Sequence, residues 1–188
     1  MNTLTHLGTV QLNTERLILK RISLNDSYTM FANFACDDKV SRYMSWDTFN
    51  NEKSVYKWLT EWQEEYKKLD TYYWGIFLKS NKEIIGTVYL FTECESSNVA
   101  SISYCLGHDY WGNAYVCEAV KAIIDFAFNE IGFNRIEAYH ADSNIQSAKV
   151  LQKVGMKKEG TLRQRCKTHI GYEDCTYYSI LKDEYIND

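Results

Sequence analysis

A strand, a turn and a helix follow one another directly in the segment Ser103-Tyr104-Cys105-Leu106-Gly107-His108-Asp109-Tyr110-Trp111-Gly112-Asn113-Ala114-Tyr115. The first N–H groups of a helix have no acceptor within the helix and lie at the positive end of its dipole, so they attract anions. Gly112 and Ala114 carry little side chain, and Gly112 can adopt a backbone conformation barred to other residues. The segment is therefore a candidate phosphate-binding turn, but the same arrangement occurs in many proteins that bind no anion, and the turn alone does not predict such a site.

The rest of the chain divides into strands and helices by its apolar periodicity. Strands are expected at residues 17–22, 72–78, 83–91, 99–106, 135–140, 161–167 and 176–181. Helices are expected at residues 23–35, 55–69, 115–131 and 144–154. The three consecutive middle strands indicate an antiparallel meander. This order predicts one α/β (α+β) domain over residues 1–188, with helices covering a sheet.

Composition and motifs exclude several classes of function. The 188 residues are 45% apolar and 24% charged, as in soluble globular domains, and 21 basic against 25 acidic side chains leave no basic surface for nucleic acid. No segment approaches the roughly 18 apolar residues of a membrane span and the N-terminus lacks a signal pattern, so we expect a cytoplasmic protein without a membrane partner. The turn lacks both Gly-x-x-x-x-Gly-Lys-Ser/Thr and Gly-x-Gly-x-x-Gly, which excludes a Walker loop and disfavours a dinucleotide fold.

The six cysteines are scattered singly, and none belongs to a Cys-x-x-Cys pair. In a chain long enough to bury a proper core, this pattern favours free thiols over disulfides. Cys166 and His169 have a spacing found in zinc sites, but a matching second pair of ligands is missing. We therefore predict no metal site.

Several runs together resemble the GNAT N-acetyltransferases, in the branch of the ribosomal-protein acetyltransferases RimJ and RimL. The resemblance covers nearly the whole chain. It rests on these runs: Asp109-Tyr110-Trp111-Gly112-Asn113-Ala114-Tyr115-Val116-Cys117-Glu118-Ala119, Asn144-x-x-Ser147 with Lys153-x-Gly155-Met156, Thr14-Glu15-Arg16-Leu17, Ile85-Gly86 and Glu159-Gly160-Thr161-Leu162-Arg163.

The resemblance implies a mixed, mostly antiparallel sheet that splays open at its fourth strand, with helices on both faces and acetyl-CoA in the opening. The amides of the pantetheine arm would pair with the backbone of Tyr104, Cys105 and Leu106, as an added strand would. The pyrophosphate would rest on backbone amides of Gly112, Asn113, Ala114, Tyr115 and Val116. Ala114 and Val116 stand where the branch usually has glycine and a small residue, so both add bulk at the turn.

The resemblance also suggests roles near the reacting thioester. A backbone N–H near Leu106 could polarise the thioester carbonyl. Ser147 would donate a hydrogen bond or a proton to the departing thiolate, since Leu151 stands where many GNAT enzymes carry a tyrosine. Asn144 is expected to cap its helix and to contact the pantetheine, and Lys149 could pair with a phosphate. Local capping by Ser147 and a solvated Lys149 are the simpler alternatives.

The general base and the acceptor site are less sharply defined. Glu137 is the preferred base and His140 the alternative, because strand alternation cannot point both to one face, and a water chain could replace either. We expect residues 42–46 and 165–174 to shape the acceptor site. Aromatic walls could come from Tyr43, Trp46, Trp58, Trp62 and Tyr172, and acidic groups for a cationic amine from Asp47, Glu173 and Asp174.

The sequence thus predicts direct transfer of an acetyl group from acetyl-CoA to a primary amine, on a peptide or protein N-terminus or on a small molecule. The alternative is a catalytically weak or inactive GNAT-fold protein that binds acetyl-CoA or a partner. Ala114, Val116 and the missing tyrosine keep that alternative open. A homodimer is also left open.

Overall fold

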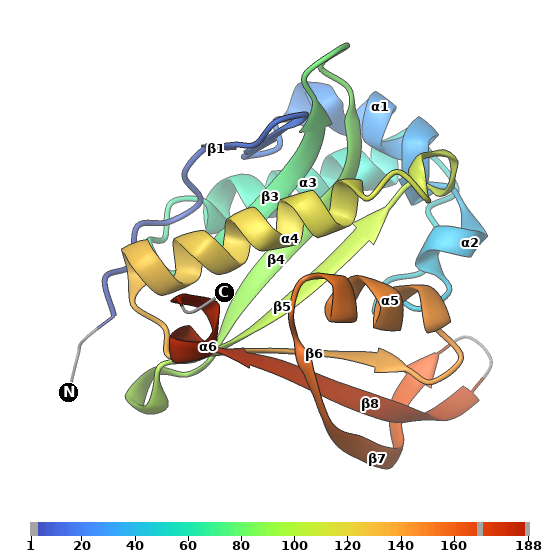
Figure 1. Cartoon of the computed structure of the whole chain (residues 1–188). Helices are drawn as coiled ribbons and strands as arrows, with labels where there is room; N and C mark the ends of the chain where they lie inside the picture. Colours follow the sequence, from blue (N-terminus) through green and yellow to red (C-terminus); the bar gives the residue numbers. More distant parts are fainter. Residues whose placement is uncertain (1–3, 169–170, 187–188) are drawn as a thin grey trace.

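The fold is built on one sheet of eight strands in the order β1-β2-β3-β4-β5-β6-β8-β7 (Figure 1). The structure, a computed structural model, describes residues 4–168 and 171–186. The strands are β1 Leu12–Asn13, β2 Leu17–Lys20, β3 Tyr72–Leu78, β4 Ile84–Cys94, β5 Val99–Leu106, β6 Arg135–Ala141, β7 Lys157–Thr168 and β8 Gly171–Leu181. Neighbouring strands run antiparallel except β5 and β6, which are parallel.

Helices cover both faces of this sheet (Figure 1). On one face lie α1 Ser27–Met30, which continues into a π-helical turn at Phe31–Ala35, α2 Asp38–Ser41 and α3 Glu52–Glu65. On the other lie α4 Tyr115–Phe126, which continues through Ala127–Ile131, and α5 Ile145–Lys153; the short α6 Lys182–Ile186 follows β8. Two hydrophobic cores result, one between the sheet and α4–α5 and one between the sheet and α1–α3.

Strands β5 and β6 pair over a short distance and then separate. Val99, Ala100 and Ser101 lie opposite Arg135, Ile136 and Glu137. Beyond this point β5 stays paired with β4 as far as Leu106, whereas β6 stays paired with β8 as far as Ala141. The two arrows diverge in Figure 1. Since β5 is the fourth long strand, the predicted splay is confirmed.

The predicted meander and the two long helices that flank it are also confirmed, but several elements were missed. Helix α2 is a single turn capped by Asp37, whose side chain accepts from the amide of Lys39. Strand β7 begins at Lys157, because it is held by pairing with β8 while most of its side chains face solvent. Apolar periodicity finds neither element, since α2 is too short and β7 too exposed.

Strands β4 and β5 pack closely at Gly86, and a substitution there tests this packing. A Cβ built on Gly86 would lie 2.3 Å from the carbonyl oxygen of Cys105 and 3.0 Å from Cα of Leu106, both backbone atoms. We predict that Gly86→Ala lowers the free energy of unfolding by about 2 kcal/mol, because overpacking forces the strands apart. Gly160→Ala is the control, since no atom lies within 4 Å of its Cβ. Urea denaturation measures both variants, and equal stability would contradict the packing described.

Candidate active site

The turn between β5 and α4 adopts a left-handed backbone at two positions. Gly112 has φ +81°, and Ala114, the N-cap of α4, has φ +59°. No side chain in the described part of the chain caps α4, so the amides of its first turn have no side-chain partner there. The space above Gly112 is open, because a Cβ there would have no atom within 4 Å. This local geometry suits an anion.

Side chains stabilise the turn by donating hydrogen bonds to backbone carbonyl groups in and next to it. The indole Nε1 of Trp111 donates to the carbonyl of Leu106 at 2.8 Å. The side-chain amide Nδ2 of Asn113 donates to the backbone carbonyls of Tyr110 and Trp111, at 3.1 and 3.2 Å. Arg16 donates from Nη1 to the carbonyl of Asn113 at 3.0 Å. The negative ends of these peptide groups are therefore engaged, while the N–H ends stay available.

An ion pair between Arg16 and Glu118 fixes the start of α4 to the β1–β2 hairpin. Nε of Arg16 lies 2.7 Å from Oε2 of Glu118, while the backbone amide of Arg16 and the hydroxyl of Thr14 both donate to Oε1. Burial raises the pKa of the Glu118 carboxyl, but the bonds from Thr14 and Arg16 outweigh burial and the net pKa is lowered. The Arg16 guanidinium also lies over the Tyr115 ring, 4.6 Å from its centroid. This clamp gives a structural role to Thr14 and Arg16.

Val116 and Ala114, the two bulkier residues of the turn, have different consequences. Val116 is buried in the core beneath α4, so its side chain does not occupy the turn. Ala114 is exposed and left-handed, a conformation that costs an L-residue roughly 1–2 kcal/mol. The strain at the turn therefore comes from Ala114.

The free edge of β5 offers the backbone groups of alternate residues only. The amide of Gly107 donates to the carbonyl of Ile85, so Cys105, two residues earlier, also directs its backbone groups at β4. Tyr104 and Leu106 direct theirs toward the side where β6 has moved away, and of these groups the carbonyl of Leu106 already accepts from Trp111. The predicted backbone contacts are thereby restricted to Tyr104 and Leu106, since Cys105 faces Thr87 with both its backbone and its thiol.

Ser147 lies in the first turn of α5, directly across from Tyr104. The oxygens of the Tyr104 and Ser147 hydroxyl groups are 2.9 Å apart. Asn144 caps α5 as predicted, because its Oδ1 accepts from the amide of Ser147 at 3.2 Å. Leu151 is buried in the core and Lys149 is exposed. The structure therefore brings Tyr104, Asn144 and Ser147 together at the splay.

Glu137 and His140 lie on opposite faces of β6. Glu137 belongs to the part of β6 still paired with β5, and its Oε1 lies 2.7 Å from Nε of Arg135. His140 is buried on the α5 side, and its Nδ1 lies 2.8 Å from the carbonyl of Ala141. A carbonyl only accepts, so Nδ1 carries the proton in this bond, and Nε2 has no partner in the described part of the chain. His140 thus has one buried ring nitrogen without a hydrogen-bond partner in that part of the chain.

Comparison with known proteins agrees with this geometry. Residues 16–157 match the family described as Acetyltransferase (GNAT) domain. The chain belongs to the GNAT acetyltransferase family. An uncharacterized N-acetyltransferase of Bacillus subtilis, YoaA, is 30% identical over 171 residues, covering 91% of this chain and 96% of the relative. The [ribosomal protein uS5]-alanine N-acetyltransferase of Escherichia coli is 25% identical, covering 80% of both chains.

Solved structures show the same fold. The ribosomal-protein-S5-alanine acetyltransferase of Vibrio fischeri superposes with a TM-score of 0.81 at 24% identity, covering 94% of this chain and 98% of that one. Membership of the family makes this GNAT chain an acetyl-CoA-dependent N-acetyltransferase, as its sequence predicts. The residues present fit that co-substrate, because the uncapped amides at the start of α4 follow directly on the free edge of β5.

The aromatic residues expected around the GNAT acceptor site are divided between core and loop. Trp46, Trp58 and Trp62 pack on one another beside α3, with ring centroids 5.9 and 4.7 Å apart. The hydroxyl of Tyr43 instead donates to the carbonyl of Ser143 at 3.4 Å, which joins the α2–α3 loop to the β6–α5 loop. Tyr172 on β8 is 69% exposed.

The predicted acidic groups of the hairpin already have partners within the chain. Thr168 donates its hydroxyl to Glu173 at 2.6 Å, and the amide of Gln164 donates to Asp174 at 2.9 Å. His169, the predicted neighbour of Cys166 in zinc-like spacing, lies outside the described residues. Elsewhere in the described chain, no three His, Cys, Asp or Glu side chains gather as metal ligands would. None of the described helices is long and apolar enough to cross a membrane.

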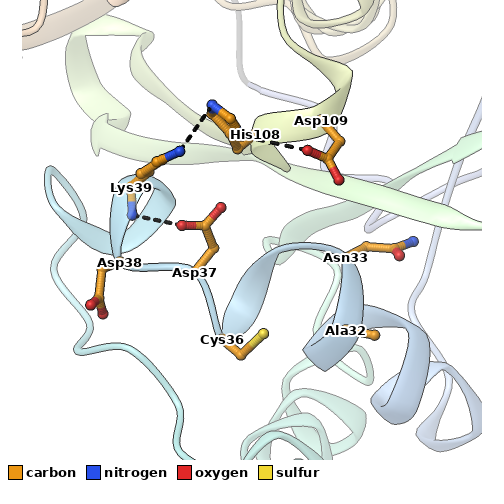
Figure 2. Close-up of a pocket in the computed structure, with 8 residues that line it drawn as sticks. All are labelled: Ala32, Asn33, Cys36, Asp37, Asp38, Lys39, His108 and Asp109. Atoms are coloured by element: carbon orange, nitrogen blue, oxygen red, sulfur yellow. Dashed lines mark hydrogen bonds and ion pairs between the residues drawn. The ribbon is translucent and has the colours of Figure 1, made fainter.

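A surface cavity of about 510 Å³ lies where the α1–α2 segment meets the β5–α4 turn (Figure 2). Figure 2 shows Lys39 reaching His108, with Nζ 3.5 Å from Nε2. The cavity is lined by Ala32, Asn33, Cys36, Asp37, Asp38, Lys39, His108 and Asp109. Sequence reasoning missed this cavity because its walls come from two distant segments without a shared motif.

Ala114 allows a direct test of the turn. We predict that Ala114→Gly raises the free energy of unfolding by about 1 kcal/mol, because glycine adopts a left-handed backbone without strain. Acetyl-CoA should bind the variant as tightly as the wild type or more tightly. Ala122→Gly, within α4, is the control and should lower stability by about 1 kcal/mol. Denaturation and calorimetry measure these effects; a large loss of affinity in Ala114→Gly would contradict the account of Ala114 as a strained position that only adds bulk to the turn.

Proposed function

We propose that this GNAT chain acetylates a primary amine by direct transfer, with acetyl-CoA bound across the splay between β5 and β6. The pyrophosphate rests on the amides of the 112–116 turn, and the pantetheine pairs with the backbone of Tyr104 and Leu106 and contacts Asn144. Lys149 on α5 is a candidate partner for a phosphate. The uncapped start of α4 carries this proposal, because it offers several N–H donors to an anion without a basic patch.

Direct transfer asks three things of the protein. The amine must be neutral so that its nitrogen can attack the thioester carbon, forming the C–N bond while the C–S electron pair moves to sulfur. We assign the polarisation of the carbonyl oxygen to the amide of Leu106, a role supported by its place on the free edge of β5. The hydroxyl of Ser147 donates to the sulfur as negative charge develops there.

The acceptor is proposed to be the amino group of a peptide or protein N-terminus, with small amines as the second candidate. A relative is named for acetylating an alanine of ribosomal protein uS5, and this favours the N-terminal amine. The link between Tyr43 and Ser143 marks one wall of the approach to the splay, and the β7–β8 hairpin marks another.

We also propose that residues 1–188 form a single domain.

A paired binding and activity assay tests this function. Acetyl-CoA should raise the melting temperature, and free thiol should be released when a peptide with an N-terminal alanine is added. The same peptide with a blocked N-terminus is the control, and spermidine represents the small amines. Stabilisation without thiol release on any amine would favour the binding protein over the enzyme.

Asn144 and Ser147 should separate binding from turnover. We predict that Asn144→Ala weakens acetyl-CoA binding about tenfold, because it removes the cap of α5 and a pantetheine contact. Ser147→Ala should lower kcat about tenfold or more with little change in acetyl-CoA affinity. Gln146→Ala, between them on α5 and exposed, is the control. Unchanged turnover in Ser147→Ala would remove this hydroxyl from the mechanism.

Glu137 is the base that the sequence predicts, but its ion pair with Arg135 argues against that role. Oε1 of Glu137 already accepts from Nε of Arg135 at 2.7 Å, so this oxygen is engaged within the strand. We therefore predict that Glu137→Gln lowers kcat by less than about tenfold at neutral pH, with solvent taking the amine proton. Glu159→Gln is the matched control, since Glu159 also pairs with Arg135. A loss of about 100-fold or more in Glu137→Gln alone would make Glu137 the base.

A further inference from the structure

The hydroxyl of Tyr104 contacts the side chain that the mechanism needs at the sulfur. The Tyr104 oxygen lies 2.9 Å from Oγ of Ser147 and 3.3 Å from the carbonyl oxygen of Ser147. Tyr104 belongs to β5 and Ser147 to α5, which are 43 residues apart in the chain. The contact therefore spans from the strand on one side of the splay to the helix that follows the other.

Burial keeps the Tyr104 phenol protonated, so that it can donate to an oxygen of Ser147. It raises the pKa of the Tyr104 phenol well above its ordinary value, while the bond to Ser147 opposes this only partly. A phenol with a raised pKa keeps its proton at neutral pH. A buried O–H needs an acceptor, and the oxygens of Ser147 are the acceptors within reach.

Donation from Tyr104 determines what Ser147 can do. A hydroxyl has one hydrogen and two lone pairs, so Oγ of Ser147 can accept from Tyr104 and still donate its own hydrogen elsewhere. The backbone of Ser147 is already fixed, because its amide donates to Oδ1 of Asn144. With both backbone and oxygen held, the hydroxyl hydrogen has few directions left.

We propose that Tyr104 is a positioning residue, whose phenol donates to Oγ of Ser147 and so directs the serine hydrogen at the departing sulfur. This inference rests on the proposed function. The C–S electron pair moves to sulfur, where the Ser147 hydrogen bond stabilises the thiolate. The amine proton leaves to solvent, and the thiolate is protonated from solvent after release. Tyr104 gains and loses no proton, so the step balances without it.

Tyr104→Phe removes the hydroxyl and keeps the ring. We expect kcat to fall about tenfold, while KM and the calorimetric Kd for acetyl-CoA change less than about twofold. Tyr178→Phe is the control, because that phenol lies in the same core but bonds to Gln152 at 3.4 Å. The control should keep full turnover.

A double-mutant cycle separates positioning from a general structural role. Tyr104→Phe made in a Ser147→Ala background should lower kcat no further, because the group it positions is gone. Full turnover in Tyr104→Phe, or losses in the two variants that multiply in the double variant, would overturn the proposal. A wild-type chain that releases no thiol with any amine would overturn the proposed function itself, and the role of Tyr104 with it.

Discussion

The short pairing between β5 and β6 is the constraint on which the site depends. Only three residues of β5 pair with three residues of β6. Beyond them, β5 remains paired with β4 alone and β6 with β8 alone. Strand edges with unpaired N–H and C=O groups are costly when buried and prone to unwanted pairing. Here the edge of β5 is proposed to receive the pantetheine, whose amides would complete the interrupted ladder. The interruption of the sheet would then create the binding surface.

The turn that follows β5 is strained and firmly held. Ala114 adopts a left-handed backbone, while Arg16, Trp111 and Asn113 engage the carbonyls around it. Strained backbone of this kind persists only where surrounding contacts determine it, and it gathers at functional sites. The clamp between Arg16 and Glu118 therefore holds the start of the helix in place before any ligand arrives.

Local sequence patterns predicted the parts of the molecule that depend on nearby residues. The apolar stripe of α4 and the capping of α5 by Asn144 each involve residues that are close together in the sequence, so both could be predicted. The clamp from Arg16 to Glu118 joins residues 102 positions apart, and only the tertiary fold brings them together. The same holds for the contact of Tyr104 with Ser147. The ion pair of Glu137 with Arg135 was missed for another reason. The two side chains lie on one face of β6, but that placement alone does not predict that they pair.

The proposed site depends on backbone amides at the start of α4, which would hold the pyrophosphate of acetyl-CoA. Amide chemical shifts of the labelled chain test it most directly, when acetyl-CoA is compared with S-acetyl-pantetheine, which lacks the pyrophosphate. We predict large shifts at Tyr115, Val116 and Cys117 with acetyl-CoA only, and shifts at Tyr104 and Leu106 with both. Equal shifts at the start of α4 with the two ligands, or none with either, would contradict the account.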